Sequence, residues 1–489
     1  MTKHLDIDTK AMRAKILDLA IRGKLTDQRQ EDGNARDLLK EIQEEKERLI
    51  KEKKIKKEKP LPEITEEEKP FDIPENWEWV RLGNIAQAIN GDRGKNYPKR
   101  AEYVSSGIAW INTGHITDDG YLNADKMNYI TRDKYDSLRS GKIQRNDLLF
   151  CLRGSFGKVA RIEPFYEGAI ASSLAIIRLF DTALREYIFI YLKSPQAVNE
   201  LNKYANGTAQ PNLAAKDVLK YLIPLPPLAE QQRIADKVSA LFAQLDAIDK
   251  AYEEYRELQQ TMKAKLLELA IQGKLTDQRK EDGNARDLLK EIQAEKEKLI
   301  KEKKIKKEKP LPEIAEEEKP FEIPENWEWV RLGEIIELQS GQDFPKSKYS
   351  DTDKEGIPYI TGASCFTKNG VLENRWTRFP KCIVTKGDIL LVCKGSGYGK
   401  ITICNLQEVH IARQIMAIKQ NEYLNLSYIE SFLMARIKLI KENGQGLIPG
   451  ISRDIVLNLL FPLPPLAEQQ RIVAKLDELL PHLNPGKEP

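Results

Sequence analysis

The sequence predicts an α+β protein in which an antiparallel pair of long coiled-coil helices separates two similar α/β modules, with helical arms and a pseudo-twofold axis. Three features predict this architecture. Residues 12–85 recur at 262–335, where ten of the 74 aligned positions differ. A heptad pattern occupies the centre of the chain. Short apolar runs, bounded by glycine and aspartate, fill the two segments between the repeats.

The repeats divide the 489 residues into successive segments. A second repeat, PLPPLAEQQRI, occurs at 224–234 and again at 462–472. The repeated residues, called the frame below, are nearly identical, whereas the modules share only short landmarks. We therefore expect one module fold with two different targets; a recent duplication with drifting middles is the alternative. The expected domains are an N-terminal helical arm at 1–73, module one at 74–227, a central helix with the second arm at 228–323, module two at 324–465 and a C-terminal half helix at 466–489.

Each arm is expected to contain a helix that begins after an asparagine. Asn34 and Asn284 suit the N-cap position, because their side-chain oxygens can accept a hydrogen bond from the first helical turn. The helix is expected to run through LLKEIQEEKERLIKEKKIKK and to end near Pro60 or Pro310. We interpret the lysine run as a solvated helix face, with a contact to DNA or a partner as the alternative.

A long central helix is expected from Leu228 to Gly273, which spans roughly 70 Å at ~1.5 Å per residue. Its first half matches the C-terminal tail and its second half matches residues 12–25, so the chain ends supply a split copy that can lie beside it. Two unrelated amphipathic helices in separate cores are the alternative. The expected coiled-coil seam alternates in steps of four and three; its members are Ile234, Val238, Leu241, Leu245, Ile248, Tyr252, Tyr255, Met262, Leu266 and Leu269, with Gln259 as the polar member.

Each module opens with a Trp-Glu-Trp-Val-Arg-Leu segment, at Trp77 and at Trp327, whose alternation predicts an edge strand. Short runs rich in isoleucine, leucine, valine and phenylalanine predict further strands, and a helix is expected near the end of each module. The predicted strands include 147–151, 169–178 and 388–392, and the predicted helices are 184–192 and 428–439.

Both modules are mildly basic. The net charge is +5 from Trp77 to Pro227 and +3 from Trp327 to Pro465, so the remaining residues of this chain of net charge +3 sum to −5. Such modules can contact phosphates. For any single residue, an ordinary surface charge is the alternative.

Polar loop residues are the candidate DNA contacts, because lysines and backbone N–H groups can bind phosphates while arginine, asparagine and glutamine can read base edges. The pair Ser172-Ser173 faces Arg413-Gln414, which is either a specificity difference or core packing. The candidates are Arg93, Lys95, Lys99, Arg100, Arg153, Ser155 and Lys158 in module one, and Gln342, Lys346, Lys348, Lys394, Ser396, Tyr398, Lys400 and Arg413 in module two.

The sequence contains no motif of a known reaction centre. GSGYGK departs from the phosphate-loop spacing, and the four histidines form no HExxH or zinc pattern. We also find no GxSxG and no glycine-rich S-adenosylmethionine pocket, so we expect no catalytic or metal-binding residues. No run approaches the ~18 apolar residues of a membrane span. The start has no secretory signal, and five cysteines without a CxxC pair favour a reduced, cytoplasmic compartment.

The chain resembles the specificity subunits of type I restriction-modification systems. The resemblance rests on P-x-x-W-x-W-V-x-L-G at 74–83 and 324–333, on IPLPPLAEQQRI at 223–234 with its echo at 461–472, and on the GKLT arm segments. It implies two target recognition domains, each reading half of a bipartite, asymmetric target in double-stranded DNA, with the helices setting the spacer. It also implies two methyltransferase subunits that bind S-adenosylmethionine, restriction subunits that use ATP and Mg²⁺, and a non-catalytic role for this chain, without cofactors of its own. Many members begin near the first Trp motif, whereas this chain has a full arm before it.

Two alternatives from other functional classes remain open at this point. One is a self-contained DNA-modifying enzyme with an unrecognised site, which methylation by the purified chain alone would support. The other is a coiled-coil scaffold that binds only proteins. A failure to bind DNA at any salt concentration, even with partners present, would favour the scaffold.

Overall fold

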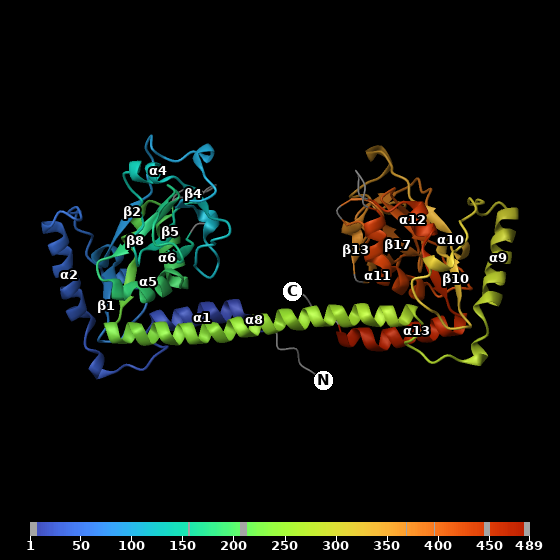
Figure 1. Cartoon of the computed structure of the whole chain (residues 1–489), viewed down its shortest axis with the longest axis horizontal. Coiled ribbons are helices and arrows are strands. Elements are labelled where there is room, and N and C mark those ends of the chain that lie inside the picture. The colour runs from blue at the N-terminus through green and yellow to red at the C-terminus, as the bar shows by residue number, and fades with distance from the viewer. Residues whose placement is uncertain are drawn as a thin grey trace. The chain divides into compact units, whose positions relative to one another are not determined.

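The computed structural model describes residues 7–154, 157–205, 213–367, 369–395, 397–444 and 450–483. The chain forms two compact units, Met1–Tyr252 and Glu253–Pro489, and the boundary between them falls within one long helix, α8 (Leu228–Ile271). Each unit contains an arm, a module and half of α8 (Figure 1). The two units are therefore described separately.

The arm of the first unit contains α1 (Thr9–Ile21) and α2 (Ala35–Lys51). As predicted, Asn34 caps α2, and its side-chain oxygen accepts from the N–H of Arg36 at 2.9 Å. The predicted end near Pro60 is wrong. Lys53 adopts a left-handed conformation (φ 58°), and the N–H of Lys54 bonds to the carbonyl of Leu49, which closes the helix. The second arm repeats this pattern: α9 (Ala285–Lys301) ends before Lys303, where φ is 57°.

Module one is built on three small sheets. A four-stranded sheet has the order β2-β8-β5-β6, a three-stranded sheet has the order β4-β3-β7 with β3 and β7 parallel, and β1 pairs with β9 next to the frame. The strands are β1 (Glu78–Arg81), β2 (Ala86–Asn90), β3 (Ile108–Ile111), β4 (Asn128–Ile130), β5 (Leu148–Cys151), β6 (Val159–Arg161), β7 (Gly168–Ile170), β8 (Leu174–Leu179) and β9 (Leu222–Leu225).

The predicted strand at 169–178 is in fact two strands in different sheets. β7 ends at Ile170 and β8 begins at Leu174, and the turn between them carries the chain from the three-stranded to the four-stranded sheet. Small side chains at Ala171 and Ser173 allow this turn without glycine or proline, so the sequence gives no break signal. The strand predicted at 147–151 is confirmed as β5.

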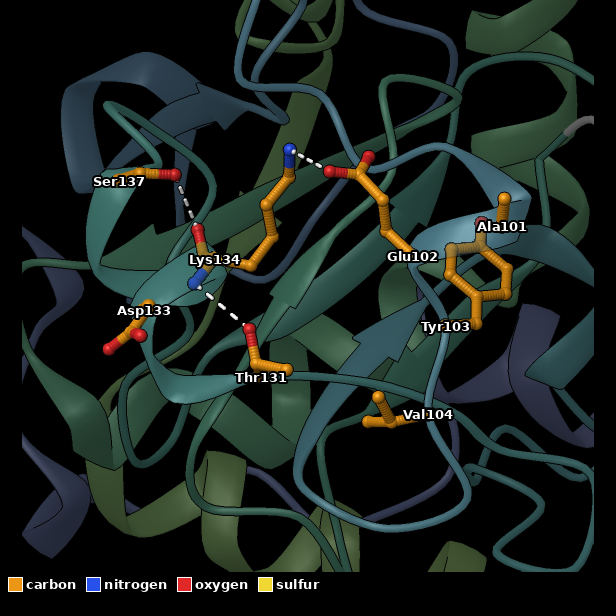
Figure 2. Close-up of a pocket in the computed structure, with 8 residues that line it drawn as sticks. All are labelled: Ala101, Glu102, Tyr103, Val104, Thr131, Asp133, Lys134 and Ser137. Atoms are coloured by element: carbon orange, nitrogen blue, oxygen red, sulfur yellow. Dashed lines mark hydrogen bonds and ion pairs between the residues drawn. The ribbon is translucent and has the colours of Figure 1, made fainter.

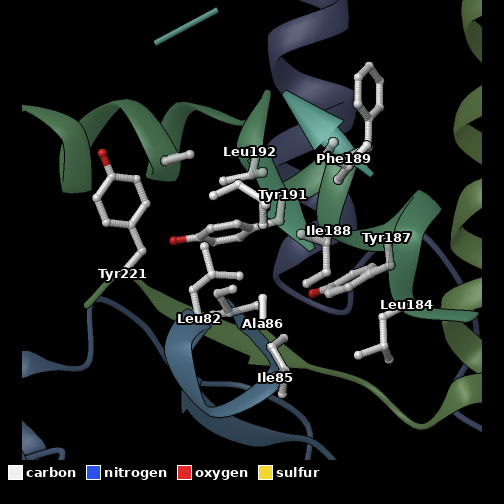
Figure 3. Close-up of a cluster of buried hydrophobic side chains, with 14 of the residues drawn as sticks. Leu82, Ile85, Ala86, Leu184, Tyr187, Ile188, Phe189, Tyr191, Leu192 and Tyr221 are labelled. Carbon is white, nitrogen blue, oxygen red and sulfur yellow. The ribbon is translucent and has the colours of Figure 1, made fainter. Parts of the chain in front are cut away.

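Helices cover the base of module one and form its main core with β1 and β9. The predicted helix at 184–192 is α5, and its tyrosines are fully buried (Figure 3). The hydroxyl of Tyr191 donates to the carbonyl of Leu222 at 2.7 Å, and that of Tyr187 donates to the carbonyl of Pro224. These bonds attach the module to the segment that leads into α8. The helices are α3 (Leu82–Ile85), α4 (Arg132–Ser137), α5 (Arg185–Leu192), α6 (Pro195–Tyr204) and α7 (Ala215–Val218).

Module two has the same plan with a larger second sheet. Its four-stranded sheet has the order β11-β20-β17-β18, the second sheet has the order β15-β12-β19-β16, and β10 pairs with β21. The strands are β10 (Glu328–Arg331), β11 (Leu338–Ser340), β12 (Ile357–Ile360), β13 (Phe366–Thr367), β14 (Gly370–Val371), β15 (Trp376–Thr377), β16 (Ile383–Thr385), β17 (Ile389–Val392), β18 (Ile401–Ile403), β19 (Glu408–Ile411), β20 (Ile415–Ile418) and β21 (Leu460–Leu463); the helices are α10 (Leu332–Ile335), α11 (Leu426–Asn443), α12 (Arg453–Leu457) and α13 (Leu466–Leu479).

Each half of α8 has a helix from a chain end beside it (Figure 1). In the first unit α1 runs antiparallel to α8: Thr9 bonds to Asp249 at 2.7 Å, and Thr26, beyond the end of α1, reaches Glu230. In the second unit, Ile472 and Leu476 of α13 lie in the same core as residues of α8. The predicted seam is partly buried. Ile234, Val238 and Leu245 are buried, Leu241, Leu266 and Leu269 are half-buried, Ile248, Tyr252, Tyr255 and Met262 are exposed, and the polar member Gln259 is buried.

A buried glutamate joins arm, module and helix in each unit. Glu230 at the start of α8 accepts from the indole N–H of Trp77 at 2.7 Å and from Gln28 at 2.6 Å. In the second unit, Glu468 accepts from Trp327 and Gln278 at the same two distances. The same three parts of the frame are therefore joined by the same contacts twice.

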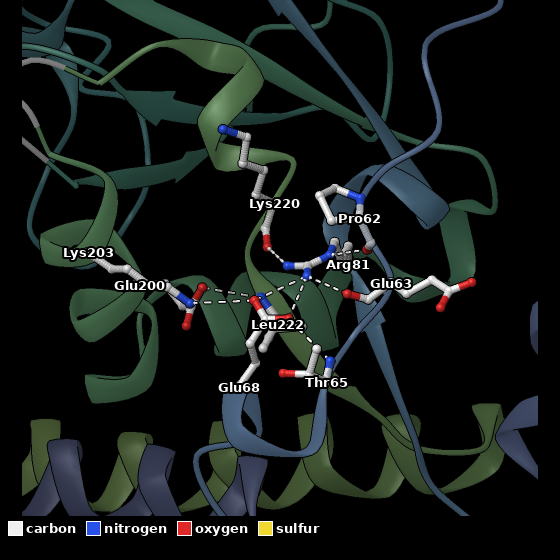
Figure 4. A network of polar contacts seen from close by, with 9 residues as sticks. All are labelled: Pro62, Glu63, Thr65, Glu68, Arg81, Glu200, Lys203, Lys220 and Leu222. Atoms are coloured by element: carbon white, nitrogen blue, oxygen red, sulfur yellow. Dashed lines mark hydrogen bonds and ion pairs between the residues drawn. The ribbon is translucent and has the colours of Figure 1, made fainter.

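A buried arginine forms a second repeated junction. Arg81, only 3% exposed, donates to the carbonyls of Pro62 and Lys220 and to the carboxylate of Glu68 (Figure 4). The hydrogen bonds and the guanidinium of Arg81 hold the pKa of Glu68 below its usual value, although burial alone would raise it. Arg331 makes the matching contacts in the second unit. The extended connector after each arm is thereby fixed against the base of its module.

Candidate nucleic-acid interface

The sheet topology brings the ends of several strands of module one to one edge. Asn90 at the end of β2 pairs with Ala175, and Cys151 at the end of β5 pairs with Leu174. Because β3 and β7 run parallel, both end at the same side. The loops that follow emerge together, and we call this the loop edge of module one; its described residues are 91–95, 152–154, 157–158 and 171–173.

Hydrogen bonds fix these loops to one another. The N–H of Leu152 donates to the carbonyl of Ser173 at 2.9 Å, and the N–H of Ala171 donates to Ile111 at 2.7 Å. A side chain on Gly91 would come within 2.5 Å of the carbonyl oxygen of Ile170, so this close approach requires glycine. These contacts hold the described parts of the loops against one another at Gly91, Leu152 and Ala171.

Module two has an equivalent loop edge, whose described residues are 341–345, 393–395, 397–400 and 412–414. The N–H of Gln342 donates to Ile411 at 2.9 Å, and the N–H of Cys393 donates to Gln414 at 2.7 Å. A side chain on Gly341 would come within 2.1 Å of the carbonyl oxygen of Ala412, as at Gly91. This glycine aligns the two loop edges residue by residue.

The structure brings some predicted contact residues together and leaves others apart. Arg93, Lys95 and Arg153 are exposed at the loop edge of module one. Lys158 is also there, but its ammonium pairs with Asp118 at 2.5 Å, which reduces its capacity for phosphate. Ser155 lies outside the described residues. Lys99 and Arg100 are exposed farther along, beyond the loop edge.

The same division holds in module two. Gln342, Lys394, Lys400 and Arg413 are exposed at the loop edge, and Tyr398 there is half-buried. Ser396 lies outside the described residues. The exposed Lys346 and Lys348 are anchored away from the edge, where the carbonyl of Lys348 accepts from Thr377 at 2.8 Å.

A hollow lined by Ala101 and Glu102, which follow Lys99 and Arg100 in the chain, is a poor candidate for a phosphate site (Figure 2). Its ammonium group, on Lys134, is taken by Glu102 at 2.8 Å, and this pair lowers the pKa of the Glu102 carboxyl. Asp133 adds a second carboxylate. Two carboxylates against one neutralised lysine disfavour an anion. The lining residues are Ala101, Glu102, Tyr103, Val104, Thr131, Asp133, Lys134 and Ser137.

Three residues that shape the loop edges were missed in the sequence. The buried carboxylate of Asp92 accepts from the N–H groups of Arg139 and Gly94, which lower its pKa. His410 is buried and bonds the carbonyl of Gln342 at 2.8 Å, and burial lowers its pKa. Asp343 pairs with Arg413 at 2.7 Å. The sequence offers a signal only for Asp343, because an acid there replaces Arg93 of module one.

No group of metal-binding side chains and no disulfide occurs within the described ranges. Among the helices described, none is both long and apolar enough to cross a membrane. The fold and the loop edges thus define a recognition protein with two modules of one design on a repeated helical frame. A family comparison supplies the function.

The chain belongs to the family described as the type I restriction modification DNA specificity domain, whose model matches residues 74–255 and 324–487. Two relatives from Escherichia coli are the type I restriction enzyme EcoAI specificity subunit, 30% identical over 97% of this chain and 89% of the relative, and the EcoEI specificity subunit, 27% identical over 96% and 88%. A solved chain from a type I R-M system has the same fold, with a TM-score of 0.62 and 24% identity over 85% of this chain and 92% of that one. The protein is therefore a non-catalytic specificity subunit with two target recognition domains, which works with methyltransferase and restriction subunits and DNA.

Proposed function

We propose that the two modules, at 74–227 and 324–465, each read one half of a bipartite, asymmetric DNA sequence with the residues of their loop edges. The supporting observation is the contrast between frame and loops. The frame contacts of Trp77 with Glu230 and of Trp327 with Glu468 are identical at 2.7 Å, whereas the loop edges differ in nearly every exposed side chain. A constant frame with variable loops suits a protein that presents different readers in one geometry.

The exposed members of each loop edge have complementary tasks in this proposal. Lys95, Lys394 and Lys400 contact phosphates, which positions the modules without reading sequence. Arg93 and Gln342 have side chains that can form hydrogen bonds with base edges. We also propose that Arg153 and the half-buried Tyr398 contribute to these contacts, as do the residues off the edge, Lys99, Arg100, Lys346 and Lys348.

We further propose that α8 sets the spacer between the half-sites. Methylation of such a target requires two methyltransferase subunits that carry S-adenosylmethionine, and cleavage requires restriction subunits with ATP and Mg²⁺; all of these cofactors lie outside this chain. The frame, present twice, offers one docking surface for each methyltransferase. These partners place the complex in the cytoplasm.

The first experiment maps methyladenine in cells with and without this gene, in the presence of its methyltransferase partner. A gene-dependent motif that is split, asymmetric and of fixed gap is the expected result. Methylation by the purified chain alone would instead favour a self-contained enzyme. Binding of proteins with no DNA binding at any salt concentration would favour the scaffold.

A heptad insertion tests the spacer. The exposed stretch of α8 after Tyr252 is the place for it, because the packing of Ile234 and Val238 in the core of the first unit is left intact. Seven residues add about 10.5 Å of helix, which corresponds to about three base pairs at ~3.4 Å each. The gap should lengthen while both half-sites stay the same. A changed half-site sequence would refute the proposal.

A further inference from the structure

The turn between β19 and β20 holds one arginine at the loop edge of module two. Within this turn the N–H of Ile415 donates to the carbonyl of Ala412 at 2.9 Å. The N–H of Ala412 donates to Ile360 at the end of β12, and the carbonyl of Gln414 accepts from the strand end of β17. The backbone on both sides of Arg413 is therefore bonded to the end of β12, to the residue after β17 and to the start of β20. The side chain of Arg413 is nevertheless 73% exposed.

A carboxylate orients this arginine. One oxygen of Asp343 accepts from the backbone N–H of Arg413 at 3.1 Å, and the other lies 2.7 Å from the side-chain Nε of Arg413 and forms an ion pair with the guanidinium. Among the described residues, Asp343 alone forms an ion pair with the side chain of Arg413. The carboxylate thus engages the Nε of the guanidinium and leaves the Nη1 and Nη2 groups for a ligand.

The loop that carries Asp343 is itself held in place. The N–H of Gln342 bonds to Ile411 at 2.9 Å, and its carbonyl bonds to the buried ring of His410 at 2.8 Å. Phe344 stacks on the same ring, with 4.3 Å between the ring centroids. Asp343 and Arg413 therefore come from two loops whose backbones are both bonded to the sheet that contains β12 and β19.

Module one has the opposite arrangement at the same place. Aligned on Gly91 and Gly341, Arg93 occupies the position of Asp343, and Ser172 occupies the position of Arg413. The turn of module one therefore carries no guanidinium and cannot form this pair. The two modules differ here in a contact that can distinguish bases.

We propose that Arg413 reads a guanine in the major groove within the half-site of module two, with Asp343 as its positioning residue. This inference rests on the proposed function. A guanidinium with two free, parallel donors matches the O6 and N7 acceptors of guanine, a contact that other bases do not offer. A phosphate can accept the same paired donors, but that contact would position the module without reading sequence.

The test compares methylation maps and DNA affinities of the complete complex containing Arg413→Ala, Arg413→Lys or Asp343→Asn. Arg413→Ala should relax one guanine position of one half-site, with a loss of discrimination of about 10- to 100-fold, and should leave the other half-site unchanged. Arg413→Lys keeps the charge without the paired donors, so it should also relax that position. Asp343→Asn should weaken the preference at the same base alone.

Arg378→Ala is the matched control, since Arg378 is also exposed and pairs with Asp353 at 3.0 Å, but lies at the opposite edge of the sheet. It should leave the motif intact. A uniform loss of binding for Arg413→Ala, with a salt slope reduced by about one, would indicate a phosphate contact and overturn the inference. An unchanged motif would overturn it as well. The absence of a split motif in the unaltered complex would instead contradict the proposed function.

Discussion

Replacing Glu230 by alanine tests the junction of arm, module and helix in the first unit. The carboxylate is fully buried and accepts from Trp77 at 2.7 Å, Gln28 at 2.6 Å and Thr26 at 3.2 Å. Burial raises the pKa of Glu230, while these hydrogen bonds oppose the shift. The substitution removes the common acceptor of three donors, two from the arm and one from the start of the module.

The expected cost follows from which donors water can reach. Trp77 is 2% exposed, so its indole N–H would remain buried without a partner, at about 1–3 kcal/mol. Gln28 is exposed and Thr26 half-buried, so water can replace most of their lost bonds, at about 0.5 kcal/mol each. The sum is a loss of about 2–4 kcal/mol in the free energy of unfolding of the first unit.

Hydrogen exchange followed by mass spectrometry measures each unit separately, which a single melting curve of a two-unit chain does not. Peptides around Trp77 and the start of α8 should exchange faster in Glu230→Ala, and those of the second unit should not. Glu468→Ala should give the mirror result, because its partners are the same. Glu257→Ala, at an exposed site on α8, is the control. A change below about 0.5 kcal/mol for Glu230→Ala would contradict the reasoning.

Three further predictions concern the module bases and the loop edge. Arg81→Met removes a buried donor set and should destabilise the first unit by about 2–4 kcal/mol, measured as faster hydrogen exchange in the peptides of that unit; unchanged exchange there would contradict this. Gly341→Ala places a methyl group 2.1 Å from the carbonyl of Ala412 and should cost about 1–3 kcal/mol, seen as faster exchange at residues 408–418. Burial lowers the pKa of His410 from 6.5, so the unfolded chain takes up a proton first and the second unit should lose stability as the pH falls below 6.5. The first unit has Ala169 at that position but also a buried histidine, His115, whose pKa burial likewise lowers. The test therefore compares the unaltered chain with His410→Gln, and an acid sensitivity of residues 408–418 that this substitution leaves unchanged would refute the prediction.

The sequence predicts the frame well because its signals are local. Asn34 is a cap read from its neighbours, and the apolar spacing of α8 gives its bounds within two residues. The end of α2 was wrong because it depends on Lys53, which adopts a left-handed conformation that lysine rarely takes. Helix propensity alone favours continuing through the lysine run.

The loop edges could be predicted only in part. That Arg93 and Arg153 lie in loops follows from the glycines around them, but their meeting at one edge depends on the antiparallel pairing of both β2 and β5 with β8. The break between β7 and β8 carries no sequence signal, so the turn that presents Arg413 was hidden as well. The pairing of Arg413 with Asp343 joins residues 70 positions apart and required the sheet to be seen.

The two frame junctions explain how loops can change without moving a module. Arg81 donates to the backbone carbonyl of Lys220, and Arg331 donates to that of Asn458, so the side chain at this module position is free to vary. The buried tyrosine of each module likewise donates to a backbone carbonyl, that of Pro224 or its counterpart Pro462. The arginine junctions thus take only a backbone carbonyl from the module, whereas each tyrosine junction joins one buried side chain of the module to a backbone carbonyl of the frame. A new set of loop residues therefore keeps the same attachment, and a change of target need not change the frame.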